Sequence, residues 1–170
     1  MFKFFRHLKY KKMIKTGSSL LLADFAEIVN SMISRLEKDG RIKTPLHKEV
    51  LKFESTALIF WLFRQSNAFP ELLHKLTLDE MHQQYFALLK KRGYDRASVQ
   101  AVCDDFTVRY KTYDKFVGNQ NDFGKVGTSF ASFVSERAKT GLDATETMIP
   151  LELIKKATLK FDEIREVMKI

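Results

Sequence analysis

The amino-acid sequence predicts an all-α protein, a single helical bundle of about six long helices and one short helix. Apolar residues recur at helical spacing through the chain after residue 17, with no alternating strand pattern of useful length. Only 7 Gly and 3 Pro occur among 170 residues, against 15 Phe, and this composition favours long regular elements over many turns. The expected connections between helices are mostly short, as antiparallel neighbours in a bundle require.

The first fifteen residues differ in charge from the rest of the chain. They contain six Lys or Arg residues and no acidic residue, so they carry +6 of the formal net charge of +8 and leave +2 for residues 16–170. Aromatic residues are interspersed among these cations. We therefore predict a basic, aromatic N-terminal arm or helix at residues 1–15 and a helical-bundle domain at residues 16–170.

The first long helix is expected from about Ser19 to Asp39. Ser18 or Ser19 is the expected N-cap, because a serine side chain accepts a hydrogen bond from the free backbone N–H groups of the first turn. Gly40 follows the last apolar position and is suited to the left-handed conformation in which many helices end.

The second helix is expected at about 45–66. Thr44 and Pro45 open it, and proline is tolerated at the first helical position because its missing N–H would have no partner there. Residues 57–63 are apolar around almost the whole circumference of the helix. Such a helix is surrounded by others, and we expect it at the centre of the bundle.

The remaining elements follow from caps and glycines. We expect a short helix from Pro70 to Lys75, a helix opened by a capping box of Thr77 and Glu80 and ended by Gly93, and helices at about 95–118, 122–141 and 150–168.

One line of polar residues crosses an apolar face of the second helix. His47, Glu54 and Trp61 are spaced by seven residues, so they lie along one side of that helix. A buried carboxylate is costly unless it is paired, hydrogen-bonded, protonated or bound to a metal. His82 faces the apolar side of its own helix, and His74 ends a Glu-X-X-His sequence. Two histidines and a carboxylate from this set are the ligands of a candidate metal or small-ligand site.

A structural role is the alternative for the same residues. In this interpretation Glu54 pairs with an arginine or lysine of another helix, and the histidines lie at helix edges. No cofactor and no catalytic residue is predicted from the sequence. A ferritin-like di-iron centre would need two Glu-X-X-His helices, and the chain has one.

Two further motifs have ordinary structural explanations. Gly124 and Gly127 lie in a segment that lacks the spacing of a phosphate-binding loop, and Gly127 is interpreted as a point of close helix approach. Cys103 faces the expected core, where a thiol is inert. No stretch of about 18 consecutive apolar residues occurs, so no transmembrane span is predicted.

The N-terminal arm is the stronger functional candidate. On a helix, its apolar residues cluster on one side and its first cations lie opposite, as in segments that bind anionic membrane surfaces. The pattern ends after Leu8, because Lys9 and Lys12 turn onto the apolar side. The same cations would also suit nucleic-acid phosphates or a protein partner. The structural alternative is a helix packed on the bundle or a partly ordered terminus. The predicted surface-binding residues of the arm are Phe2, Lys3, Phe5, Arg6, Lys9, Lys11, Lys12 and Lys15.

From these observations we expect a non-enzymatic helical interaction module that binds a protein partner or forms a homo-oligomer, with an arm that contacts an acidic or membrane surface. The alternative is a metal- or small-ligand-binding helical protein that uses His47, Glu54, His74 and His82. A nucleic-acid-associated protein is the third hypothesis. The single cysteine is typical of a reducing compartment, so we expect a cytoplasmic protein, peripheral to the inner membrane face where the arm binds.

Overall fold

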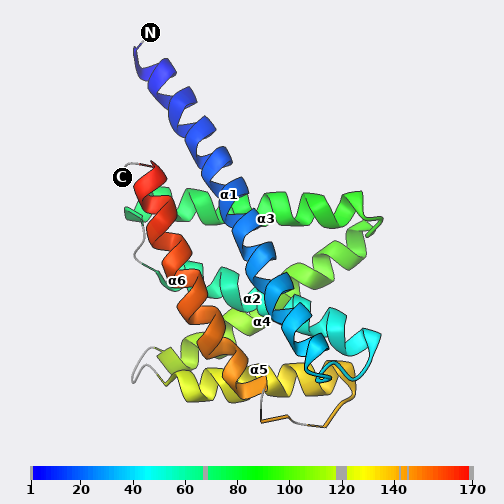
Figure 1. Ribbon diagram of the computed structural model, residues 1–170. Helices are drawn as coiled ribbons and strands as arrows, with labels where there is room; N and C mark the ends of the chain where they lie inside the picture. Colours follow the sequence, from blue (N-terminus) through cyan, green and yellow to red (C-terminus); the bar gives the residue numbers. More distant parts are fainter. Residues whose placement is uncertain (1, 67–68, 118–121, 142, 145, 169–170) are drawn as a thin grey trace.

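The structure, a computed structural model, describes the chain except residues 1, 67–68, 118–121, 142, 145 and 169–170. The described part is all-α, as predicted, and contains no strand. Its elements are α1 (Phe2–Lys38), α2 (Pro45–Gln65), α3 (Glu71–Lys91), α4 (Arg96–Val117), α5 (Phe123–Ala138), the 3-10 turn η1 (Glu146–Met148) and α6 (Ile149–Met168). They form one helical bundle, in which α1 and α6 pack together and α3 crosses α1 (Figure 1).

Helix α1 begins much earlier than predicted. It runs without interruption from Phe2 to Lys38, so the arm and the first predicted helix are one element. Ser19 does not cap a helix, because its hydroxyl donates to the backbone oxygen of Lys15 from inside α1. The other predicted cap, Ser18, is buried against α3, where its hydroxyl donates to the backbone oxygen of Thr77 at 3.1 Å. This tertiary contact explains why helix continues where the local sequence predicted a start.

Helix α3 is likewise one element instead of two. The expected capping box does not form, because Thr77 lies fully buried within α3 where it faces Ser18 of α1. The helix is preceded by Pro70, whose backbone oxygen accepts from the N–H of His74. Packing against α1 therefore outweighs the local preference of a Thr-X-X-Glu sequence for a helix start.

Several predicted helix ends are confirmed. The Thr44 hydroxyl accepts from the backbone N–H of His47 at 3.0 Å, with Pro45 at the first helical position of α2. Asp95 caps α4 by accepting from the N–H of Ser98 at 2.7 Å. Helix α5 ends earlier than predicted, at Ala138, because Lys139 adopts the left-handed conformation with a φ of 53°.

Helix α2 contacts five other helices, α1, α3, α4, α5 and α6. Every residue from Ala57 to Phe63 is buried, on all sides of the helix. Aromatic rings from neighbouring helices pack edge-on against this segment. Phe60 contacts Phe25 of α1 at a ring-centroid distance of 6.5 Å, and Phe63 contacts Phe161 of α6 at 5.3 Å.

Gly127 lies at a close approach between α5 and η1. A Cβ atom on this residue would lie 2.4 Å from the backbone oxygen of Thr147, which is closer than real Cβ contacts allow. Gly127 lies inside α5 and is buried. A larger residue would collide with the backbone of η1, which agrees with the interpretation of Gly127 as a point of close helix approach.

Candidate functional site

Glu54, the unexpected carboxylate of α2, is completely buried and forms a bidentate ion pair with Arg109 of α4. Arg109 Nη2 donates to Glu54 Oε1 at 2.7 Å, and Arg109 Nε donates to Glu54 Oε2 at 3.0 Å. The Arg109 side chain is itself buried. Arg109 compensates the negative charge of the buried Glu54 carboxylate. This pairing agrees with the structural role that was the alternative to a metal site for Glu54.

A second acid and a second arginine complete this cluster. Arg137 of α5 lies 3.0 Å from Asp105 and 3.4 Å from Glu54, and Asp105 lies 3.6 Å from Arg109. Burial by itself lowers the pKa of Arg109, but the hydrogen bond and the charge of Glu54 outweigh that effect and the pKa is raised. Both arginines also lie over aromatic rings, Arg109 over Phe133 and Arg137 over Phe53. The cluster joins α2, α4 and α5 through balanced charges.

His47 lies at the other end of α2 and contacts a different acid. Its Nδ1 accepts from the backbone N–H of Lys43 at 3.2 Å, so Nε2 carries the ring proton and donates to Glu146 Oε1 at 2.9 Å. Burial and the positive charge of Lys43 lower the pKa of His47. Burial, together with the negative charge of Asp143, raises the pKa of Glu146 to about 7. At neutral pH the His47 imidazole is therefore neutral, and it hydrogen-bonds the Glu146 carboxyl group, whose pKa is close to that pH.

The other two histidines lie among aromatic rings. His74 stacks on Phe63 with ring centroids 4.6 Å apart, and His82 packs against Phe60 with its Nε2 2.8 Å from the Tyr110 hydroxyl. Burial lowers the pKa of both imidazoles. Neutral histidines in these positions act as aromatic packing residues, and His82 adds one hydrogen bond.

The four residues predicted from the sequence are therefore not brought together. Glu54 pairs with arginines, His47 with Glu146, His82 with Tyr110, and His74 with Phe63. Among the described residues, no three His, Cys, Asp or Glu side chains form a group that could hold a metal ion. The geometry gives no support to the predicted metal site.

Two partners of these residues were missed at the sequence level. Arg109 comes three residues after Phe106 and four before Tyr113, which are both buried. This spacing places Arg109 on the apolar face of α4, so its burial could have been predicted from the sequence. Glu146 lies in a short turn without helical periodicity. Nothing in the local sequence there indicates that it is buried.

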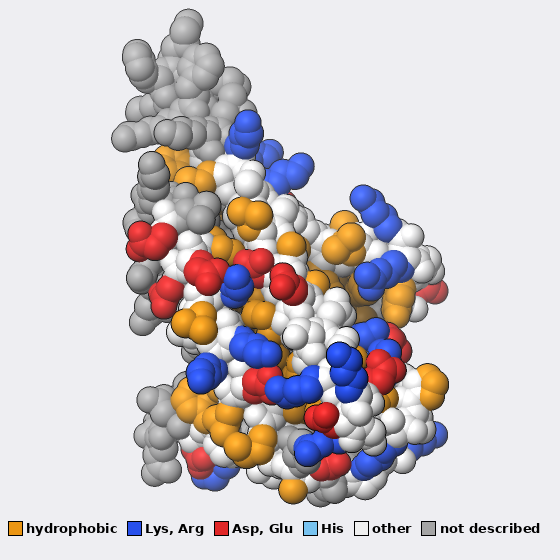
Figure 2. Space-filling model, in the orientation of Figure 1, with side chains coloured by type: hydrophobic (Ala, Val, Ile, Leu, Met, Phe, Trp, Pro, Cys, Tyr) orange, Lys and Arg blue, Asp and Glu red, His pale blue; other side chains and the backbone are white. Residues whose placement is uncertain are grey.

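The basic start of α1 extends beyond the rest of the bundle (Figure 1). Lys11, Lys12 and Lys15 are exposed, and so is half of the Tyr10 side chain. Lysine and arginine side chains gather along the described upper part of α1 in Figure 2. The side chains of the other predicted arm residues, Phe2, Lys3, Phe5, Arg6 and Lys9, lie outside the described part, although their backbone is helical.

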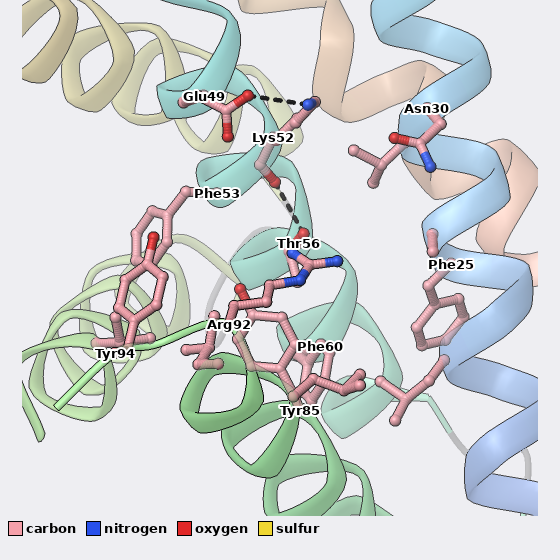
Figure 3. Close-up of a pocket in the computed structure, with 16 residues that line it drawn as sticks. Phe25, Asn30, Glu49, Lys52, Phe53, Thr56, Phe60, Tyr85, Arg92 and Tyr94 are labelled. Carbon is pink, nitrogen blue, oxygen red and sulfur yellow. Dashed lines mark hydrogen bonds and ion pairs between the residues drawn. The ribbon is translucent and has the colours of Figure 1, made fainter. Parts of the chain in front are cut away.

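A pocket of about 320 Å³ opens between α1, α2, α3 and the turn that leads to α4 (Figure 3). Its walls are mainly apolar and include Phe25, Val29, Phe53, Phe60 and Leu89, and its rim carries polar groups from Glu49, Lys52 and Arg92. The volume is at the lower end of the roughly 300–1,000 Å³ usual for small-molecule sites. No local pattern predicts this pocket, because its walls come from four separate segments of the chain.

Compared with known proteins, the chain matches no family, no curated protein and no solved structure. None of the helices in the described part is long and apolar enough to cross a membrane.

Proposed function

We propose that this protein is a helical interaction module that binds a protein partner and attaches to an anionic membrane surface through the basic start of α1. The observation that carries the proposal is the uninterrupted α1, which extends as a helix beyond the bundle and presents a segment with six cations and no acid. A positively charged helix is attracted to anionic lipid headgroups by about 1 kcal/mol per basic residue near the surface.

Contacts with α3 fix the point at which this segment leaves the bundle. The Ser19 hydroxyl oxygen lies 2.9 Å from Gln84 Oε1 and 2.9 Å from the backbone oxygen of Lys15, so its single proton is shared between these two acceptors. Gln84 Nε2 donates to the same backbone oxygen of Lys15 at 3.2 Å. Ser18, which donates to the backbone oxygen of Thr77, and the preceding Gly17 are both buried in α1. The preceding turns thus project from a fixed base, which reduces the entropy lost on binding.

Exposed apolar residues support the protein-partner half of the proposal. Met148, Leu151 and Leu159 are spaced by three and eight residues along η1 and α6, and each is 43% exposed or more. That spacing places them on one face. Exposed apolar side chains gathered on a helix face are typical of a surface that contacts another protein.

Vesicle binding tests the role of the arm. The full chain should bind vesicles of 30% phosphatidylserine and 70% phosphatidylcholine and should bind pure phosphatidylcholine at least ten times more weakly. Replacing both Lys11 and Lys12 by Glu should lower the affinity for the anionic vesicles at least tenfold, because two attractive charges become repulsive. The matched control replaces Lys90 and Lys91, exposed at the end of α3, by Glu.

Equal losses in the two double variants would overturn the role of α1, since they would show a response to net charge alone. Binding that is insensitive to salt between 50 and 500 mM would also contradict the proposal, because exposed charges are screened over this range. Thermal unfolding of each variant establishes that the bundle is intact.

A further inference from the structure

The pocket between α1, α2 and α3 has rigid aromatic walls. Tyr85 packs against Phe60 and Phe106 with ring-centroid distances of 5.6 Å to each, and Phe60 in turn contacts Phe25. These rings belong to four different helices that are held together by the core. The apolar surface of the pocket is therefore formed before any ligand arrives, which lowers the cost of binding.

The mouth of the pocket carries a net positive charge. Lys52 Nζ pairs with Glu49 Oε1 at 2.9 Å, so these two charges offset each other. Arg92, at the end of α3, extends over the opening (Figure 3). Among the described residues no acidic side chain pairs with the Arg92 guanidinium, in contrast to Arg35, Arg64, Arg109 and Arg137.

The Tyr85 hydroxyl is a second donor in the same pocket as this guanidinium. Burial raises the pKa of Tyr85 to about 12, and the nearby charge of Arg92 opposes that rise. The phenol therefore keeps its proton at neutral pH and is a hydrogen-bond donor. Within the described part of the chain, no hydrogen-bond acceptor takes that proton.

The geometry points to a binding site for a small anionic amphiphile, a molecule with a carboxylate head and a short apolar body. The carboxylate would accept two hydrogen bonds from the planar guanidinium of Arg92 and one from the Tyr85 hydroxyl. The apolar body would lie against Phe25, Val29 and Phe60. A neutral ligand of the same shape leaves Arg92 without a counter-charge, and a cationic one is repelled by it.

Three probes with the same eight-carbon chain differ in the charge of the head group: octanoate is negative, 1-octanol is neutral and octylammonium is positive. Isothermal titration of the full chain should show one octanoate site, with 1-octanol bound at least tenfold more weakly and octylammonium not bound. The variant Arg92→Met should reduce the preference of octanoate over 1-octanol at least tenfold. Its matched control is Lys91→Met, which removes a neighbouring exposed cation that does not line the pocket.

A second pair of variants tests the location independently of charge. Ala26 lines the pocket from α1, whereas Ala23 is exposed one turn earlier and does not. Ala26→Trp should fill the groove and abolish octanoate binding, and Ala23→Trp should leave it unchanged. The proposal is overturned if octanoate does not bind at millimolar concentration, or if Ala26→Trp binds it as well as Ala23→Trp does. Equal effects of Arg92→Met and Lys91→Met would also overturn it, and would assign octanoate to the general positive charge of the surface.

Discussion

Glu54 and Arg109 form a bidentate ion pair in the core, with both side chains buried and fifty-five positions apart in the sequence. The pair links α2 to α4, and Asp105 and Arg137 extend it to α5. A paired charge in this position adds little net stability compared with an apolar pair, but a single remaining charge is strongly destabilising.

Removing one partner of this pair is expected to destabilise the fold severely. Arg109→Met leaves the Glu54 carboxylate with only the 3.4 Å contact to Arg137, so the free energy of unfolding should fall by about 3–5 kcal/mol. Urea denaturation followed by the fluorescence of Trp61, the only tryptophan, measures the change. The double variant Glu54→Leu with Arg109→Met should recover most of the loss, because no uncompensated charge stays buried.

Arg64→Met is the matched control for that experiment. Arg64 pairs with Asp114 at 2.8 Å, but its side chain is 41% exposed. Removing an exposed pair of this kind costs less than about 1 kcal/mol. A comparable loss in the Arg64 and Arg109 variants would contradict the special cost assigned to the buried pair.

Gly127→Ala is expected to be destabilising by about 1–3 kcal/mol, because the new methyl group collides with a backbone oxygen that cannot rotate away. That atom, the Thr147 oxygen, would lie 2.4 Å from the Cβ. At Gly124, the nearest atom to a new Cβ is a side-chain atom, Oδ1 of Asp122, at 3.2 Å. Gly124→Ala should therefore change the midpoint of thermal unfolding much less, and a larger loss at Gly124 would refute this explanation.

The His47–Glu146 pair predicts a pH dependence of stability. The pKa of Glu146 in the folded state, about 7, is above the ordinary value of 4.5, so the folded protein holds a proton that the unfolded chain has released. This stabilisation is fully present below about pH 4.5 and is lost as the pH rises through 7. The lowered pKa of His47 acts in the opposite direction, because the unfolded chain takes up a proton at that residue as the pH falls below about 6.5.

Comparison with Glu146→Gln isolates the contribution of the carboxyl group, since His47, Lys43 and Asp143 stay in place. Relative to this variant, the wild-type protein should lose about 1–3 kcal/mol of unfolding free energy between pH 5 and pH 8. Urea denaturation at each pH gives the two curves. Parallel curves would show that Glu146 does not titrate in this window.

The helical fold could be predicted because its signals are local. The caps at Thr44 and Asp95 depend on residues within one turn, and the apolar run from Ala57 to Phe63 reports burial directly. The predicted starts at Ser19 and Thr77 were wrong for one shared reason. Both positions lie where α1 and α3 pack together, and packing kept the helices continuous through sequences that resemble caps.

By itself, the sequence determined the helical class, the helix ends at Thr44 and Asp95, and the concentration of positive charge in residues 1–15, since each depends on composition or near neighbours. Only the tertiary structure decided the partners of the polar residues. Arg109 reaches Glu54 across 55 residues and Glu146 reaches His47 across 99, distances at which spacing along the chain carries no information. The pocket below Arg92 also depends on the tertiary structure, because its walls meet only when four separate segments of the chain pack together.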